Sequence, residues 1–362
     1  MKTNSFFKKC SVILAMTVVT TVLFPLKACA KEPMHGGEPT EPDPVEKPIG
    51  VITMTATYHI AFFEVGIAAD ADNSVNISID WGDGEMSEIS DGRRSSETGR
   101  YAFSHSFSGN RSEHRITVTG NITSLNCHGC GITALDVSGN LWLTELYFHQ
   151  NQLSELDVSK NVSLERLSVS SNRLTSLDVS NNLKLLTLGC EGNRLTSLDV
   201  SRNTALVSLG CGNNLLIELD LSRNTALKHL RCFRNQLSNL DVSNNTLLEE
   251  LYVGRNKLVH LDLSNNIALI RLYCEYNQIT NLDMSKNLDL VILLVAYNPF
   301  TVSAFNDMFR TMPNRKHSSD GTISISFREA GKEIGTPAIF ECDRSIAEEK
   351  GWVFRSDLIQ LF

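Results

Sequence analysis

The chain has 362 residues, of which 42 % are hydrophobic and 20 % are charged, so it has an ordinary globular composition and room for two or three domains. Its formal net charge is −8. Neutralising the phosphates of a nucleic acid requires a basic surface, so this balance argues against a nucleic-acid partner.

Residues 1–28 have the composition of a signal peptide. They begin with basic residues, continue in a mostly apolar stretch from Cys10 to Leu26 and contain no acidic residue. A membrane-spanning helix is the weaker interpretation, because the apolar stretch is short and contains several threonines. Removing residues 1–28 leaves 29 basic and 41 acidic residues, so the exported chain is more acidic still.

Two kinds of cleavage are compatible with the residues around Cys29. Leu-Lys-Ala-Cys resembles a lipoprotein box, which makes Cys29 a lipid-attachment site, whereas Ala-Cys-Ala suits ordinary signal peptidase. The proline- and glutamate-rich residues 29–48 then predict a flexible tether, as an anchored domain requires. We expect an exported protein, held at the outer membrane or cell surface by lipid alone, or else secreted.

Residues 49–120 show the pattern of short half-buried strands. Apolar and polar residues alternate in 51–56, 75–79 and 115–119, and glycines punctuate the segments between them. This pattern predicts a small antiparallel β-sandwich.

Residues 121–298 repeat themselves with a fixed period. The string Asp-Val-Ser-x-Asn begins at Asp136, and its aspartate recurs every 21 residues up to Asp283. One unit is LTELYFHQNQLSELDVSKN, residues 143–161. A constant period of this length predicts turns that stack on one another and bury a continuous core.

Each repeated position has a physical role. A period of two within a strand turns two residues of every unit inward, first leucine and then cysteine, valine or phenylalanine. We therefore predict nine strands, centred on Leu125, Leu146, Leu167, Leu188, Leu209, Leu230, Leu251, Leu272 and Leu293. An asparagine follows each strand, from Asn151 to Asn298, and we expect its buried amide to bond the backbone of the adjacent turn.

The unit resembles the short bacterial leucine-rich repeats, whose signature has asparagine or cysteine after the strand; here the first turn has Cys130. Ile79-Asp80-Trp81-Gly82-Asp83-Gly84, with His105-Ser106-Phe107, resembles a PKD-type immunoglobulin-like domain (the polycystic-kidney-disease repeat family). The order of modules is similar to secreted surface proteins of the Bacteroides group. Residues 299–362 should form an α/β cap over the last apolar layer, with helices near 305–311 and 345–350 and a strand near 322–327.

Candidate metal and redox residues have structural explanations in the repeat. Cys127 and Cys130 form a CxxC motif, but each occupies a regular position of the 21-residue unit. Cys190, Cys211 and Cys232 lie in successive strands with parallel side chains, which does not suit a disulfide dihedral, so we expect free buried thiols.

The acidic groups are interpreted in the same way. Asp80, Asp83 and Glu85 do not have the spacing of a calcium loop and fit a turn between strands. The repeated aspartates must face water or accept backbone N–H bonds, with a column of bound cations as the alternative. No catalytic grouping or phosphate loop is apparent, so we expect no enzyme, cofactor or metal.

The concave face of the solenoid is the candidate binding site. The columns through 145, 147 and 149 point outward; they are small and polar at Ser168, Ser170, Gly189, Gly210 and Gly212 and change in the later turns. There they hold His229, Arg231, Phe233, Glu250, Tyr252, Arg271, Tyr273 and Glu275, and the neighbouring loop column adds Arg234, Arg255, Tyr276 and Tyr297.

Tyrosine and arginine concentrate binding energy at interfaces, although aromatic residues also stabilise neighbouring strands. We expect alanine at Tyr252 and Tyr273 to weaken binding and leave thermal stability nearly unchanged. The sequence thus predicts a monomeric, non-catalytic binding protein whose concave face engages an extracellular protein, in adhesion or host interaction. The alternative is a carbohydrate-binding accessory protein of a polysaccharide-uptake system.

Overall fold

The structure is a computed structural model that describes residues 49–58, 60–67, 77–107, 112–315, 324–326 and 341–355. All of them belong to one unit, Lys47–Phe362. The predicted signal peptide, Cys29 and the tether lie outside the described residues.

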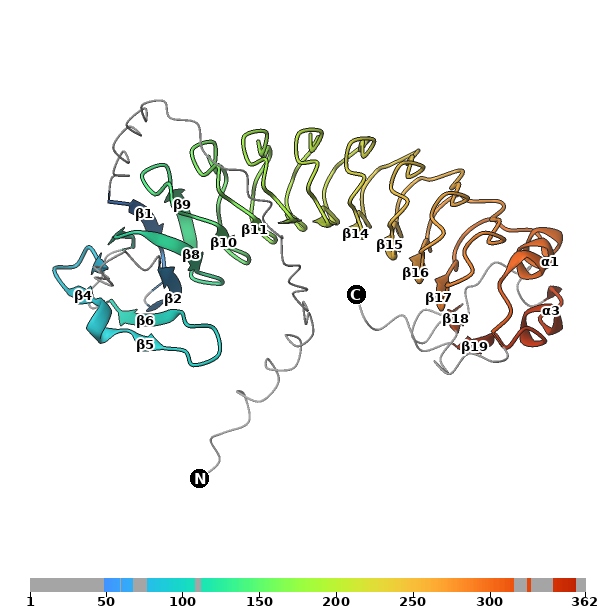
Figure 1. The fold of residues 1–362 in the computed structure, drawn as a ribbon, viewed down its shortest axis with the longest axis horizontal. Helices are drawn as coiled ribbons and strands as arrows, with labels where there is room; N and C mark the ends of the chain where they lie inside the picture. The colour runs from blue at the N-terminus through green and yellow to red at the C-terminus, as the bar shows by residue number, and fades with distance from the viewer. Residues whose placement is uncertain are drawn as a thin grey trace, which may run out of the picture. The chain divides into compact units, whose positions relative to one another are not determined.

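The repeats form a parallel β-solenoid with 21-residue turns (Figure 1). In every pair of neighbouring strands the central leucines lie opposite each other, as Leu146 lies opposite Leu167. The nine strands coincide with the nine predicted leucines, which confirms that residues one period apart lie in columns. They are β8 (Ile122–Asn126), β10 (Glu145–Tyr147), β11 (Arg166–Ser168), β12 (Thr187–Gly189), β13 (Ser208–Gly210), β14 (His229–Arg231), β15 (Glu250–Tyr252), β16 (Arg271–Tyr273) and β17 (Ile292–Leu294).

The solenoid interior is a stack of apolar columns. The strand leucines are buried, and so is the second inward column that contains Cys127, Phe148 and Val169. Leu153 and Val158, on the segment that returns to the next strand, are buried in the same interior. Burying one aliphatic side chain contributes roughly 1.5–3 kcal/mol, and here most of that area is covered by the turns before and after.

The asparagine after each strand bonds the neighbouring turn, as predicted. The Asn172 Nδ2 donates to the carbonyl oxygen of Phe148 at 2.9 Å, one turn back, and to that of Val169 at 3.0 Å. Its Oδ1 accepts from the backbone N–H of Leu153 at 2.9 Å. One amide therefore satisfies polar groups of two turns in the apolar interior.

A second asparagine column was not predicted. It is the final residue of the repeated Asp-Val-Ser-x-Asn string, and every member is fully buried. The Asn182 Nδ2 donates to the carbonyl oxygens of Val158 at 3.0 Å and Asn161 at 2.9 Å. The column comprises Asn140, Asn161, Asn182, Asn203, Asn224, Asn245, Asn266 and Asn287.

The N-terminal strands form two sheets. One has the order β4-β3-β7-β1-β9. The other extends the solenoid sheet through β8-β2-β6-β5. The ring of Phe63 in one sheet lies 5.3 Å from the ring of Trp81, which directly follows a strand of the other sheet. The strands are β1 (Val51–Ala56), β2 (Ile60–Ile67), β3 (Ser78–Asp80), β4 (Met86–Glu88), β5 (Arg93–Arg94), β6 (Tyr101–Ser106), β7 (His114–Thr119) and β9 (Ile132–Asp136), with a 3-10 turn at Ile89–Asp91.

Strand pairing crosses the expected boundary between residues 120 and 121. Strand β2 is antiparallel to β8, and β1 is antiparallel to β9, although β8 and β9 belong to the first repeat. The solenoid sheet therefore begins on strands supplied by the preceding segment.

The C-terminal end carries the expected α/β elements. Helix α1 (Val302–Thr311) begins where the Thr301 hydroxyl accepts from the Ala304 N–H at 3.1 Å, and it buries Phe305, Met308 and Phe309. The cap also contains α3 (Ser345–Glu348). Two further parallel strands, β18 (Ser324–Ser326) and β19 (Val353–Arg355), continue the sheet beyond β17, and β19 was not predicted.

Candidate binding face

The carboxylates of Asp80 and Asp83 bond groups of their own turn and of strand β6. The Asp80 Oδ1 accepts from the Gly82 N–H at 2.9 Å, and the Asp83 Oδ2 lies 2.7 Å from the His105 Nε2. Burial raises the pKa of Asp83, but the hydrogen bonds from His105 and the Glu85 backbone outweigh it and leave that pKa below its ordinary value. This supports the predicted turn between strands.

The repeated aspartates cap the convex turns. Each Oδ1 accepts from the N–H of the serine two residues later, at 2.8 Å for Asp178 and 2.9 Å for Asp199. These bonds lower the pKa of Asp178, although the charges of Asp157 and Asp199 act in the opposite direction. The predicted backbone N–H bonds are therefore confirmed.

The cysteines of the inward strand column are buried and free. Burial raises the pKa of Cys190 and brings that of Cys232 to about 12, so these thiols stay protonated as apolar filling. The interaction between the neighbouring Cys127 and Cys130 thiols raises the pKa of Cys127 and lowers that of Cys130. Among the described residues, no three His, Cys, Asp or Glu side chains converge as metal ligands.

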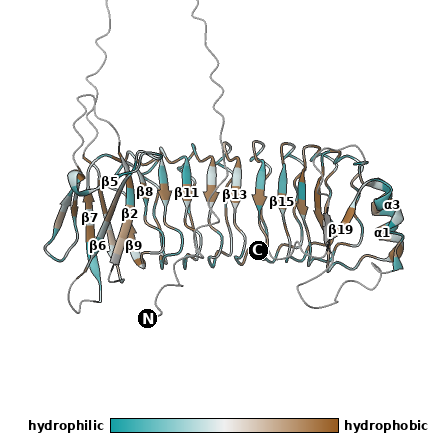
Figure 2. Ribbon diagram, turned by 90° about the horizontal axis from the view of Figure 1, so that it is seen from below, coloured by the Kyte–Doolittle hydropathy of each residue, from teal (hydrophilic) through white to brown (hydrophobic). Residues whose placement is uncertain are grey.

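The predicted concave residues come together on and directly after the strands β14, β15 and β16. Figure 1 shows these strands along the inner side of the curved row, and Figure 2 shows them side by side. The register pairs His229 with Glu250 and Glu250 with Arg271 in one column. It pairs Arg231 with Tyr252 and Tyr252 with Tyr273 in the next, so side chains 21 residues apart are direct neighbours.

Glu250 is the centre of a charged cluster. Its carboxylate pairs with the Arg271 guanidinium and lies 3.6 Å from the His229 Nδ1 and 3.8 Å from the Arg231 Nη2. The hydrogen bond from His229 and the nearby arginines hold the pKa of Glu250 below its ordinary value. The Glu250 side chain is only 14 % exposed, whereas Arg231 and Arg271 are 48 % and 41 % exposed. The cluster thus presents cationic groups outward.

Tyr252 and Tyr273 are buried, which contradicts the expectation that they project freely from the concave face, so we now expect alanine there to destabilise the fold. Their rings stack 4.3 Å apart at 7°, and only 7 % and 6 % of the two residues is exposed. Leu294, Phe233 and Ile292 pack around them in a small apolar cluster on the concave face, separate from the core inside the solenoid. These tyrosines support the face by packing and present little of their own surface.

The loop column that contains Arg234, three residues after the end of β14, has a left-handed backbone. The φ angles are 51° at Arg234, 59° at Arg255, 55° at Tyr276 and 58° at Tyr297. This conformation costs a residue other than glycine about 1 kcal/mol or more, and two turns have glycine at the same position, Gly129 and Gly192. The four later turns therefore keep large side chains where the backbone favours glycine.

These large side chains stack in sequence. The Arg255 guanidinium lies 4.0 Å from the centre of the Tyr276 ring, and the rings of Tyr276 and Tyr297 are 4.0 Å apart at 9°. Nearby, a Cβ on Gly212 would lie 2.7 Å from the Phe233 ring, so the absence of a side chain at Gly212 leaves room for this ring. The Glu275 carboxylate occupies the space above Gly254, and burial raises the pKa of Glu275.

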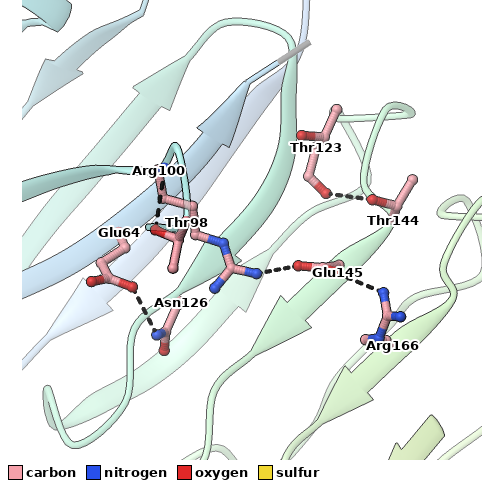
Figure 3. A network of polar contacts seen from close by, with 8 residues as sticks. All are labelled: Glu64, Thr98, Arg100, Thr123, Asn126, Thr144, Glu145 and Arg166. Carbon is pink, nitrogen blue, oxygen red and sulfur yellow. Dashed lines mark hydrogen bonds and ion pairs between the residues drawn. The ribbon is translucent and has the colours of Figure 1, made fainter. Parts of the chain in front are cut away.

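A second polar cluster lies at the first repeat turns and was missed (Figure 3). Glu145 pairs with Arg166 of the next turn at 2.8 Å and with Arg100, which precedes β6. The Arg100 guanidinium also lies 5.4 Å from the centre of the Tyr147 ring. Glu145, Tyr147 and Arg166 lie in the same concave columns, so the repeat period could have indicated them; Arg100 lies outside the repeats and could not be found in this way.

No protein-family profile matches the chain, and comparison with curated protein sequences gives no match. Among solved structures, the functional domain of InlJ from Listeria monocytogenes, described as including a cysteine ladder, is similar at 33 % identity over 57 % of this chain, with a TM-score of 0.49. The chain spans 49 % of that domain. The internalin InlF from the same organism is similar at 22 % identity over 57 % of this chain and 73 % of its own, with a TM-score of 0.39.

The turns themselves define the fold class. Parallel strands every 21 residues, inward leucines and an asparagine that bonds the next turn are the architecture of a leucine-rich-repeat solenoid. This is the fold class predicted from the sequence. In the part of the chain that the structure describes, no helix has the length and apolar character needed to cross a bilayer.

Proposed function

We propose that this protein is a non-catalytic binding protein whose concave repeat face engages an extracellular protein partner. The observation that carries the proposal is the register of β14–β16, which brings arginine and tyrosine side chains from three consecutive strands onto one face. Arginine combines a fixed set of hydrogen-bond donors with a large contact area. Rigid aromatic neighbours already hold its side chain in position, so it loses less conformational entropy when a partner binds.

The stacking geometry favours a protein partner over a polysaccharide. A sugar ring packs against the flat face of an aromatic ring. Tyr252 has Arg231 at 5.2 Å on one side and Tyr273 on the other. Tyr276 lies in the same way between Arg255 and Tyr297. Both faces of these rings are covered, so the face offers guanidinium groups and ring edges instead.

The proposal extends to the location of the protein. Export through residues 1–28, lipid attachment at Cys29 and a tether over 29–48 would hold the repeats at the cell surface or outer membrane. A PKD-like module before the repeats suits such a surface protein. Adhesion or host interaction is the role that we propose for this arrangement.

Selection of random displayed peptides on the purified repeats tests the proposal, with a glycan array run in parallel. We expect peptide ligands whose affinity falls at least about tenfold in an Arg231→Ser/Arg234→Ser variant, because both side chains are exposed on the concave face. Arg202→Ser/Arg223→Ser removes the same charge from the convex turns and should leave the affinity unchanged. Glycan binding that depends on Arg231 and Arg234, with no peptide ligand, would support the polysaccharide alternative instead.

A further inference from the structure

The charge on the later concave turns is opposite to that of the whole chain. The chain has a net charge of −8. Across the turns from residue 229 to residue 297, the concave and left-handed columns hold four arginines and two glutamates, with His229 in addition. Of the two glutamates, Glu250 is already paired with Arg271, and Glu275 is largely buried above Gly254. The exposed part of this face is therefore cationic.

Two of the four arginines, Arg234 and Arg255, lie in the left-handed column. Arg234 and Arg255 occupy positions where glycine would relieve the backbone, as Gly129 and Gly192 do in earlier turns. Their backbone N–H groups donate to Gly254 and Glu275, both at 2.8 Å, and any residue could make these bonds. Stability alone gives no reason for arginine at Arg234, whose side chain is exposed. Gln150, Ser171 and Asn213 are left-handed in the same column, so what distinguishes Arg234 and Arg255 is that they are its only charged members.

We infer that the left-handed column, led by Arg234 and Arg255, is the specificity-determining row of this face and that its ligand is an acidic segment of polypeptide. The inference rests on the proposed function and specifies the chemistry of its partner. Guanidinium groups bind carboxylates through charge-assisted paired hydrogen bonds. Arg231 and Arg271, 48 % and 41 % exposed, extend the same cationic surface onto the strands. The covered ring faces of Tyr252 and Tyr276 favour a carboxylate-bearing peptide over an anionic glycan.

The test measures binding of fluorescein-labelled poly-L-glutamate by fluorescence anisotropy, with heparin and poly-L-lysine as comparison probes. An Arg234→Gly/Arg255→Gly variant should bind poly-L-glutamate at least about tenfold more weakly while its melting temperature changes little, because the freedom of glycine at positive φ offsets the lost contact of Arg255 with the Tyr276 ring. Gln150→Gly/Ser171→Gly changes the same column in the early turns, with φ of 59° and 56°, and should leave binding unchanged. Added salt should weaken binding to the wild type.

Three results would overturn the inference. One is poly-L-glutamate binding that survives in the Arg234→Gly/Arg255→Gly variant. Another is binding of heparin without binding of poly-L-glutamate, which would assign the cationic face to an anionic glycan. The third is selection of neutral or basic peptides that bind the concave face while poly-L-glutamate does not. That result would support the proposed function and contradict the acidic partner. Failure to select any peptide would overturn the proposed function itself.

Discussion

Two side chains on the same strand face can have opposite roles, depending on what the neighbouring turns contribute. Arg231 and Tyr252 are direct partners in one column. Arg231 remains 48 % exposed, whereas Tyr252 is enclosed between that arginine and the Tyr273 ring. The sequence predicted the direction of both side chains correctly. It could not predict their exposure, because exposure depends on which rings stack and which guanidinium groups extend beyond them.

Replacing Tyr252 by alanine should lower the free energy of unfolding by about 3 kcal/mol, because the change leaves a cavity between Arg231 and Tyr273. Tyr58, which is 51 % exposed, is the matched control, and Tyr58→Ala should cost less than about 0.5 kcal/mol. Urea titration followed by circular dichroism measures both. Equal midpoints for the two variants would show that the Tyr252 ring is not packed.

Within one repeat, some polar residues form hydrogen bonds in the buried interior and others form them in the surface turns. The two asparagine columns satisfy buried carbonyls, as Asn172 and Asn182 do. On the convex surface, each aspartate fixes a turn through the N–H of the serine two residues later, as Asp178 does for Ser180. This division explains why the strand residues can vary from turn to turn while the Asp-Val-Ser-x-Asn string hardly changes.

Acid should destabilise the solenoid through the aspartate column. Hydrogen bonds from the serines lower the pKa of Asp136, Asp157, Asp178, Asp199, Asp220, Asp241 and Asp262 below the ordinary 3.8. A carboxyl with a lowered pKa stabilises the fold above its unfolded-state pKa, and that contribution is lost as the pH falls through the folded value. Glu275 acts in the opposite direction, because burial raises its pKa above 4.5 and its ionisation therefore destabilises the fold. This carboxyl is already protonated before the pH falls to the range in which the aspartates titrate.

The urea midpoint should therefore fall between about pH 4 and about pH 2. A triple variant, Asp178→Asn, Asp199→Asn and Asp220→Asn, keeps an oxygen that accepts the serine N–H but cannot titrate. Its midpoint should fall less steeply over the same range. An identical slope in wild type and variant would show that these bonds do not depend on the charge of the aspartates.

The repeat period made the regular features predictable, because one alignment of 21-residue units assigns every column at once. The leucines, the Asn151–Asn298 column and the nine strands follow from it. The period also marks the second asparagine column, but a recurring polar residue beside an aspartate and a serine does not by itself reveal that it is buried. Strand β19, the contact of Arg100 with Glu145 and the pairing of β2 with β8 join segments that share no repeat, so no periodicity could indicate them.

For the whole molecule, the pairing of β2 with β8 makes the N-terminal strands the first layer of the solenoid. Sheet pairing continues from β5 through β2 and β8 to β19. In a solenoid each turn is stabilised mainly by its neighbours, so a weak contact at one end should affect the adjacent turns first. The junction includes Gly66, which lies opposite Ser124 next to a shift of register.

Gly66→Ala tests whether this junction joins two domains or makes one. A Cβ at Gly66 would lie 2.8 Å from the Ser124 Cβ, so the two strands must separate, at a cost of about 1–3 kcal/mol. Hydrogen exchange should become faster in β2, β8 and β10 together and stay unchanged in β15–β17, far along the stack. Gly189→Ala, whose Cβ would meet nothing nearer than 3.4 Å, is the matched control and should change exchange little. Faster exchange confined to residues 49–120, with β8 still protected, would instead make the N-terminal strands an independent domain that ends before the repeats.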